Sequence, residues 1–228
     1  MSSARNIAHQ GVSAQSRETT DYLLAHYVAG TLPAPLRALV GAHLELKPSG
    51  LRAVNGLEAL AGQSLEGIEP SPLSARDAML EAIMARQSPP RSAPAPGANR
   101  SCDILPASLV DLAGFTAREI PWRSRLPGFR EARLAELDGL SASFLWIRPG
   151  RAMPHHTHEG SELTLVVAGG FADGIGHYVR GDIAAADEGV DHRPVADEGE
   201  PCICFAVTSG ALKVTGSWAQ LFSDIFGR

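Results

Sequence analysis

Three of the eight histidines in the chain, His155, His156 and His158, fall within four residues, and Glu162 follows four residues after the last of them. On a β-strand, residues two apart point to the same side, so His156 and His158 would converge on one point while Thr157 faces away. Glu162 can return to that point from the start of the next strand. Two imidazoles and a carboxylate are a common ligand set for zinc, iron or manganese. The spacing therefore predicts a metal site at His156, His158 and Glu162, with His155 pointing outward or lying at the rim.

A closed tetrahedral site needs a fourth ligand, and two histidines farther along the chain could supply it. His192 lies in the segment GVDHRPV, where a later strand could pass beside the first pair, whereas His177 opens HYVRGD and is typical of an ordinary strand residue. Cys202 and Cys204 also share one side of a predicted strand. That placement permits redox coupling, but core packing is the more common role of a free cysteine.

The composition of the chain limits the classes of function that it can have. With 228 residues and 44% hydrophobic content, it can bury one large core or two modest ones. The formal net charge of −5, without a long basic run, argues against direct binding of nucleic acid. A polar N-terminus, and no run of 18 apolar residues, predict a cytoplasmic protein without a membrane segment. Three cysteines are too few for a disulfide framework and suit a reducing compartment.

Hydrophobic periodicity divides the chain into a helical part and a β-rich part. Residues 19–87 contain four stretches with helical spacing, for which we predict a small bundle of four short helices. The expected inner faces include Leu36, Leu39, Val40, His43 and Leu44, and, in the last helix, Leu73, Met79, Leu80 and Ile83. A proline-rich linker follows at residues 88–101. From residue 102 the period changes to two, with a turn at Asp138 and Gly139, which predicts a β-barrel or sandwich.

The histidine stretch resembles the first motif of the cupin superfamily, G-x5-H-x-H-x3,4-E-x6-G. The matching residues are Gly150, His156, His158, Glu162 and Gly169, and the looser second motif is matched by Gly181 and His192. The resemblance implies an antiparallel jelly-roll barrel with a metal ion at His156, His158, Glu162 and His192. The expected fold class is thus α+β multidomain, a small N-terminal helical bundle followed by an all-β cupin-like barrel. The expected boundaries are a disordered N-terminus at 1–17, a helical domain at 18–87, the linker at 88–101 and the barrel at 102–228, whose tail from residue 218 could form a short helix.

Residues 18–215 as a whole resemble the ChrR-type anti-sigma factors. The segments AHYVAGTL and GAHLEL look like the start of that family's helical domain, and residues 153–183 and 191–205 look like its cupin half. The resemblance implies a regulator and not an enzyme. Its helical domain would bind an extracytoplasmic-function sigma factor and keep it from RNA polymerase. Its barrel would bind zinc and respond to singlet oxygen or related oxidants such as peroxides, with release of the sigma factor.

The chain departs from the family pattern in the helical domain. That domain normally carries its own zinc through H-x3-C-x2-C and an upstream histidine. Here His43 is present, but Lys47 and Gly50 stand at the two cysteine positions and the upstream position falls near Glu18. A lysine cannot replace a thiolate and glycine has no side chain. We therefore predict that the N-terminal zinc site is lost and that one zinc ion binds, in the barrel.

Two other functions remain open at this level. Three histidines and a glutamate also serve catalysis when the metal keeps exchangeable waters, so a metal-dependent cupin enzyme such as a dioxygenase is the main alternative. Against this alternative, the helical domain would have no role in such an enzyme. In the other hypothesis the metal only stabilises the barrel, and the helices bind a partner other than a sigma factor.

Overall fold

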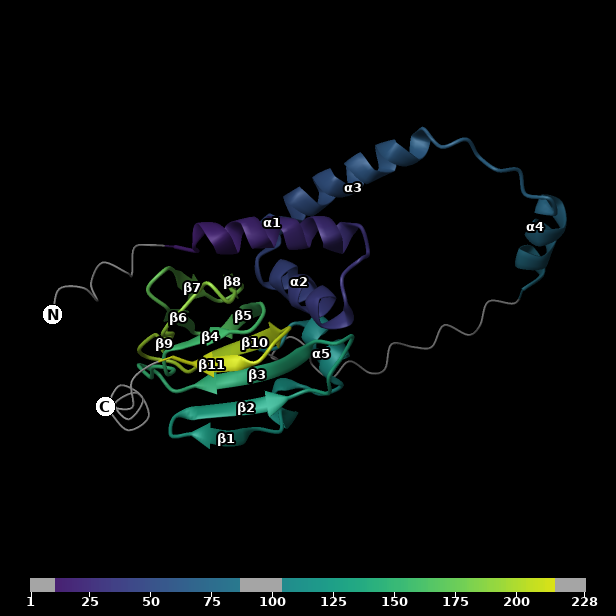
Figure 1. Ribbon diagram of the computed structural model, residues 1–228. Coiled ribbons are helices and arrows are strands. Elements are labelled where there is room, and N and C mark those ends of the chain that lie inside the picture. Colours follow the sequence, from purple (N-terminus) through teal and green to yellow (C-terminus); the bar gives the residue numbers. More distant parts are fainter. Residues whose placement is uncertain (1–10, 87–103, 216–228) are drawn as a thin grey trace.

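The computed structural model describes residues 11–86 and 104–215, with helices mainly in the first part and strands in the second (Figure 1). The described helices are α1 (Ala14–Val28), α2 (Ala34–Leu46), α3 (Leu51–Glu66), α4 (Arg76–Ala85) and α5 (Ala107–Ala113), with 3-10 turns at Pro48–Gly50 and Ala117–Glu119. The described strands are β1 (Arg123–Leu126), β2 (Phe129–Arg133), β3 (Ser141–Ile147), β4 (His156–His158), β5 (Glu162–Ala168), β6 (Gly170–Ala172), β7 (His177–Val179), β8 (Ile183–Ala186), β9 (Val195–Ala196), β10 (Cys202–Thr208) and β11 (Leu212–Val214). The predicted linker at 88–101 and the tail from residue 218 lie outside the described residues.

Helix α1 begins earlier than the sequence pattern predicted. The side chain of Ser13 accepts a hydrogen bond from the backbone N–H of Ser16 at 3.1 Å, which caps the helix. The helix therefore starts at Ala14, inside the segment 1–17 that was predicted to be disordered. The helix ends just before Gly30, which takes the left-handed conformation (φ +69°) that stops a helix.

Helices α1 and α2 pack on the barrel through the apolar faces that the sequence indicated. Leu39 and Val40 on α2 are fully buried, Leu44 is buried beside them, and α1 contributes Leu23 and Leu24 to the same core. Helix α5 packs against α2 and buries Leu109. This helix was not predicted, because residues 102–217 were assigned to strands.

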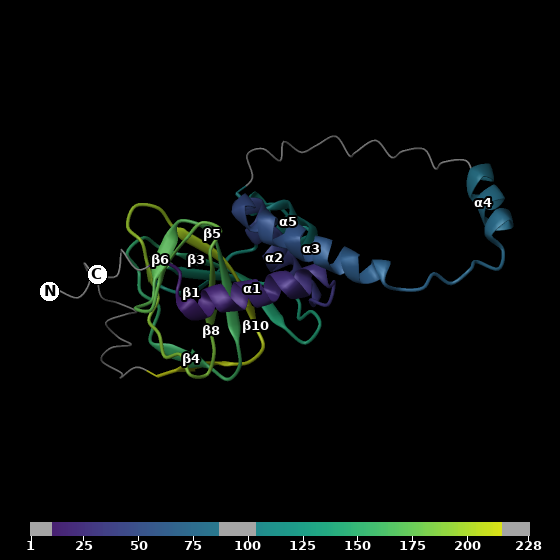
Figure 2. The same cartoon turned by 90° about the horizontal axis from the view of Figure 1, so that it is seen from above.

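The prediction of a four-helix bundle is wrong for the last two helices. The expected inner face of α4 is exposed, with Met79 at 50% and Ile83 at 61% relative accessibility, and on α3 the structure buries Val54 alone. Figures 1 and 2 show α3 leading away from the barrel and α4 standing apart from it. Periodicity shows that a helix has an apolar face, but it does not show what covers that face.

The barrel is built around a six-stranded antiparallel sheet in the order β1-β2-β3-β10-β5-β8. A two-stranded sheet (β11-β4) and a three-stranded sheet (β7-β6-β9) complete it. The predicted turn between β2 and β3 is confirmed, because Asp138 (φ +54°) and Gly139 (φ +75°) both take positive φ there. No helix in the described ranges is long and apolar enough to cross a membrane.

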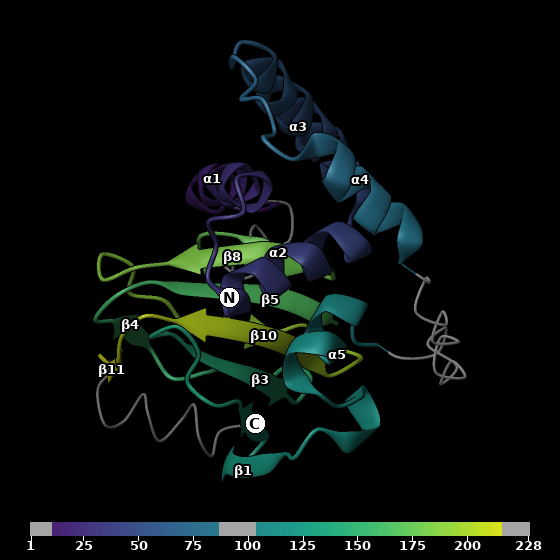
Figure 3. The ribbon, with the colours of Figure 1, turned by 90° about the vertical axis from the view of Figure 1, so that its right-hand side faces the viewer.

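The two faces of the six-stranded sheet serve different purposes. Figure 3 shows α1, α2 and α5 lying on the outer face of this sheet. Alternate side chains such as Phe144, Leu165 and Phe205 belong to the core cluster that the sheet shares with these helices. The side chains between them point into the barrel, among them Val166 and Cys204. The same alternation on β4 and β5 places polar side chains of these two strands inside the barrel, while the helices cover the outside of the six-stranded sheet.

Candidate metal centre

Four side chains from three separate segments meet inside the barrel. His156 and His158 lie on β4, Glu162 is the first residue of β5, and His192 lies before β9. One ligand atom from each of the four lies within 4.8 Å of all the others. The three histidines are buried, and the glutamate is nearly so. The structure thus brings together the four residues for which the sequence predicted a common site.

Backbone pairing holds these side chains in place. His156 and His192 form an isolated antiparallel bridge, in which each backbone N–H donates to the carbonyl of the other at 3.1 Å. Strand β4 also pairs with β11, and Glu162 is fixed in register between β8 and β10. The site is therefore carried by hydrogen-bonded strands, which position side chains more closely than free loops do.

The distances between the side chains fit a single metal ion. The Nε2 atoms of His156 and His192 are 3.0 Å apart, and His158 Nε2 lies 3.2 Å from Glu162 Oε2. Tetrahedral zinc with ligands at about 2.0 to 2.1 Å places neighbouring ligand atoms about 3.3 Å apart. Both ring nitrogens of His158 are buried and neither makes a well-aligned hydrogen bond, although Nε2 lies close to the Glu162 carboxylate. Buried polar atoms are rarely left unpaired, so a cation at this point would satisfy a group that is otherwise orphaned.

The electrostatics of the cluster also suit a cation. Burial lowers the pKa of His156 below its ordinary value, which keeps the imidazole neutral and available as a ligand at neutral pH. Burial opposes the ionisation of Glu162, but the contact with His158 and the electrostatic interaction with the neighbouring histidines hold the pKa of its carboxyl below the ordinary value overall. A neutral imidazole set with an ionised carboxylate is the form that binds a divalent metal.

The other two histidines considered from the sequence lie outside the cluster. His155 points away from it, partly exposed, with its Nδ1 3.7 Å from the carboxylate of Asp191. His177 Nε2 lies 2.8 Å from Asp197 Oδ2 in a half-exposed pair on another part of the barrel. Their positions agree with the sequence interpretation of both residues.

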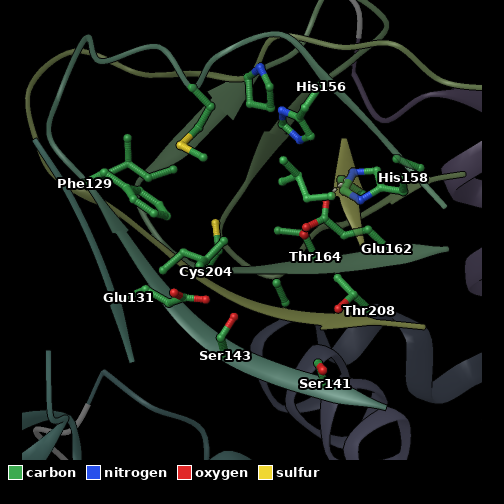
Figure 4. Close-up of a pocket in the computed structure, with 18 of the residues that line it drawn as sticks. Phe129, Glu131, Ser141, Ser143, His156, His158, Glu162, Thr164, Cys204 and Thr208 are labelled. Carbon is green, nitrogen blue, oxygen red and sulfur yellow. Dashed lines mark ion pairs between the residues drawn. The ribbon is translucent and has the colours of Figure 1, made fainter. Parts of the chain in front are cut away.

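A cavity of about 680 Å³ adjoins the cluster inside the barrel. Figure 4 shows His156, His158 and Glu162 at one end and Glu131, Ser143 and Cys204 farther along. The thiol sulfur of Cys204 lies 3.5 Å from that of Cys202, and both thiols are buried and not joined by a disulfide. The contact with Cys202, together with burial, raises the pKa of Cys204 well above its ordinary value. A raised pKa favours the protonated thiol, which is a weaker nucleophile than a thiolate.

Two positions that hold zinc ligands in the helical domain of the ChrR-type pattern contact the barrel in this chain. His43 Nδ1 donates to the backbone carbonyl of Gly181 at 2.7 Å, and Lys47 forms an ion pair with Asp182. His43 is buried, as the helical spacing predicted. The contact to the barrel was not predicted, because nothing in the spacing of the helices indicates which strand they meet.

Sequence reasoning also missed Asp173, which lies beside the cluster. Its Oδ2 atom is 3.4 Å from His192 Nδ1, and both side chains are almost inaccessible to solvent. In the sequence Asp173 stands in GGFADG, a stretch that reads as a turn. No spacing rule connects it with a histidine 19 residues later.

Comparisons with known proteins agree with this architecture. The family described as the ChrR Cupin-like domain matches residues 112–212. The anti-sigma-E factor ChrR of Cereibacter sphaeroides is 35% identical over 207 residues, which are 91% of this chain and 96% of the relative. Among solved structures, that of Rhodobacter sphaeroides SigE in complex with the anti-sigma ChrR matches with a TM-score of 0.68 and 36% identity, over 82% of this chain and 96% of that one.

Proposed function

Because the chain belongs to the ChrR family of anti-sigma factors, we propose that it binds an extracytoplasmic-function sigma factor and keeps it from RNA polymerase. The similarity supports this because it extends over nearly the full length of the relative and includes both the helices and the barrel. The matching solved chain was determined together with its sigma factor, SigE. A partner of this class supports a cytoplasmic location, and we expect neither nucleic acid nor a membrane to be a direct partner.

The observation that carries the proposal is the exposed apolar surface of α3 and α4. We call this the α3–α4 surface; it also includes Ile68 and Leu73 from the segment between the two helices. Its members, each at least half exposed, are Leu60, Leu65, Ile68, Leu73, Met79, Leu80, Ile83 and Met84. Soluble proteins rarely leave so much apolar area uncovered unless another protein covers it. Helix α3 contacts α1 and buries Val54, but the apolar side chains of the α3–α4 surface stay exposed in the described chain. Such exposed helix faces suit a sigma factor that packs between or along them.

Purification of the chain with its host's sigma factors tests the proposal directly. Leu60→Lys and Met84→Lys place a charge on the α3–α4 surface and are expected to abolish co-purification of the sigma factor. Val179→Lys is the matched control, since Val179 is 42% exposed on β7, far along the chain from these helices. Retention of the sigma factor by both helix variants, or the absence of any sigma factor with the wild-type chain, would contradict the proposal.

We also propose that His156, His158, Glu162 and His192 bind one zinc ion. Four protein ligands fill a tetrahedral site and leave no open position, which suits a structural or sensing role. His156→Ala and His158→Ala should each abolish metal retention, measured as metal per chain after dialysis, whereas His177→Ala should not. No second ion is expected in the helical segment, so the wild-type chain should hold one equivalent and not two. Unchanged metal content in the histidine variants would refute the ligand assignment.

A short segment of the barrel, residues 185–188, offers a route from the metal centre to the helices. Its first residue, Ala185, donates its backbone N–H to the buried hydroxyl of Ser16 on α1 at 3.0 Å. Glu162 is paired in register with its second residue, and Thr157 donates to the carbonyl of Glu188 at 3.1 Å. This segment therefore touches both metal-binding strands and the start of α1. Loss of the metal would loosen β4 and β5 and, through this segment, weaken the contact between the barrel and α1.

We also propose that the barrel senses oxidants and that the metal centre is the part that reacts with them. Imidazole rings are electron-rich and react with singlet oxygen, whereas the raised pKa of Cys204 makes its thiol a slow nucleophile toward peroxides. Exposure of the sigma complex to a singlet-oxygen source should release zinc and the sigma factor together. Release of the sigma factor with zinc still bound would argue that the signal enters elsewhere.

The cavity beside the cluster favours one second candidate function, that of a metal-dependent cupin enzyme such as a dioxygenase. Its volume of about 680 Å³ lies within the range of small-molecule sites. Iron or manganese in the purified chain, no protein partner, and oxygen uptake with a small diketone or thiol would support this function in place of regulation.

A further inference from the structure

The two ring nitrogens of a metal-binding histidine have different tasks. One gives its lone pair to the metal, and in the neutral ring the other carries the proton and needs a hydrogen-bond acceptor. In His156 the backbone makes this assignment, because Nδ1 lies 2.8 Å from the carbonyl oxygen of Pro154, which can only accept. The proton therefore resides on Nδ1, and Nε2 faces the cluster with its lone pair free.

His192 obtains its assignment from a side chain. Its Nε2 faces His156 Nε2 at 3.0 Å, and its Nδ1 lies 3.4 Å from Asp173 Oδ2. The side chains of His192 and Asp173 are 6% and 3% exposed, so solvent has little access to this contact. A carboxylate accepts and does not donate, which favours the proton on Nδ1 of His192.

Asp173 is itself held by the turn that it begins. Its Oδ1 atom accepts hydrogen bonds from the backbone N–H groups of Ile175 at 3.1 Å and Gly176 at 2.9 Å. The turn thus occupies one carboxylate oxygen and leaves the other directed at His192. Because the turn follows β6 directly, the barrel backbone fixes the place of Oδ2.

We infer that Asp173 is a positioning residue that holds His192 in the tautomer whose Nε2 can bind the metal. The inference rests on the proposed metal centre and adds a residue to it that touches no metal. Without the Asp173 acceptor, the proton on His192 can move to Nε2 and occupy the lone pair that the metal needs. Partners of this kind change metal affinity by about 10- to 100-fold.

Asp173→Asn tests the inference in the full chain, because it separates the turn from the tautomer. The amide oxygen can still accept from Ile175 and Gly176, whereas the amide N–H then faces His192 Nδ1 and donates to it. The proton of His192 is thereby forced onto Nε2. We expect zinc affinity, measured by competition with a chromophoric chelator, to fall about 10- to 100-fold. In the metal-free chain, the ¹⁵N shifts of His192 should change from a protonated to an unprotonated Nδ1, because Nδ1 donates to the carboxylate in the wild type and accepts from the amide in the variant.

The matched control is Asp197→Asn, which makes the same change in the His177–Asp197 pair outside the cluster. It should leave zinc affinity unchanged, and neither variant should lower the melting temperature of the metal-free chain. Wild-type zinc affinity in Asp173→Asn, or a protonated Nδ1 of His192 in that variant, would overturn the inference. A loss of affinity matched by a fall in the metal-free melting temperature would also overturn it, since it would show a structural role alone. The NMR readout needs no metal, so failure of the wild-type chain to bind zinc would count against the metal centre and not against the tautomer.

Discussion

Gly181→Ala is expected to weaken the contact between the helices and the barrel at one defined point. Gly181 has φ +87°, and a Cβ at this position would lie 2.7 Å from Lys47 Cγ and 3.1 Å from Leu46 Cβ at the end of α2. The positive φ alone costs a residue with a side chain about 1–2 kcal/mol. Forcing an extra carbon into a packed contact adds about 1–3 kcal/mol. The free energy of unfolding should therefore fall by roughly 2–5 kcal/mol.

Gly139→Ala separates the two contributions. Gly139 has a similar φ of +75°, but a Cβ there would meet nothing within 4 Å, so its loss should stay at about 1–2 kcal/mol. Urea unfolding followed by far-UV circular dichroism gives the free energy of unfolding for both variants and the wild type. Equal losses in the two variants would refute the reasoning, because they would show that α2 yields to the extra carbon without cost and is not pressed against the barrel.

The remaining predictions concern a buried hydroxyl, pH and the metal. Ser16→Ala removes the acceptor of the Ala185 N–H and should lower the free energy of unfolding by about 1–3 kcal/mol, measured in urea. The exposed Ser64→Ala is the control, and a loss in Ser16→Ala within about 0.5 kcal/mol of the loss in Ser64→Ala would contradict the prediction. Burial lowers the pKa of His43 in the folded chain below its ordinary value of about 6.5. Below that pH the unfolded chain binds more protons than the folded chain, so the free energy of unfolding of the metal-free chain should fall as the pH drops through that value. His43→Gln should flatten this dependence, and an identical pH slope would contradict the assignment. Chelation should lower the melting temperature of the wild-type chain, and the shift should grow with the zinc concentration that is withdrawn; no shift would mean that the metal does not bind the folded state preferentially.

Local rules predicted the metal-binding cluster because its residues lie on strands. The alternation of side chains on a strand puts His156 and His158 on one side, and the short turn after them lets Glu162 return to the same point. His192 is 30 residues beyond Glu162; its sequence position favoured it over His177, and the resemblance to the cupin motifs then implied it as the fourth ligand. The structure supplies the physical reason, which is the backbone bridge that pairs His192 with His156.

The helices were predicted with less success because helical spacing carries no information about partners. The apolar stripe of α2 is buried as expected, and the equally regular stripe of α4 is exposed. Both are amphipathic, and the difference lies in whether another element packs on them. An apolar stripe of this kind predicts burial, but that burial can be in a complex with another chain.

The sequence by itself determined the change from helical to strand period, the turn at Asp138 and Gly139, and three of the four clustered ligands, because each depends on residues a few positions apart. The tertiary structure alone decided that His43 and Lys47 meet Gly181 and Asp182, that Ser16 supports the edge of β8, and that Asp173 faces His192. These contacts join residues 19 to 169 positions apart in the chain. Their formation depends on how the sheets close and where the helices lie on them, which no local pattern of residues encodes.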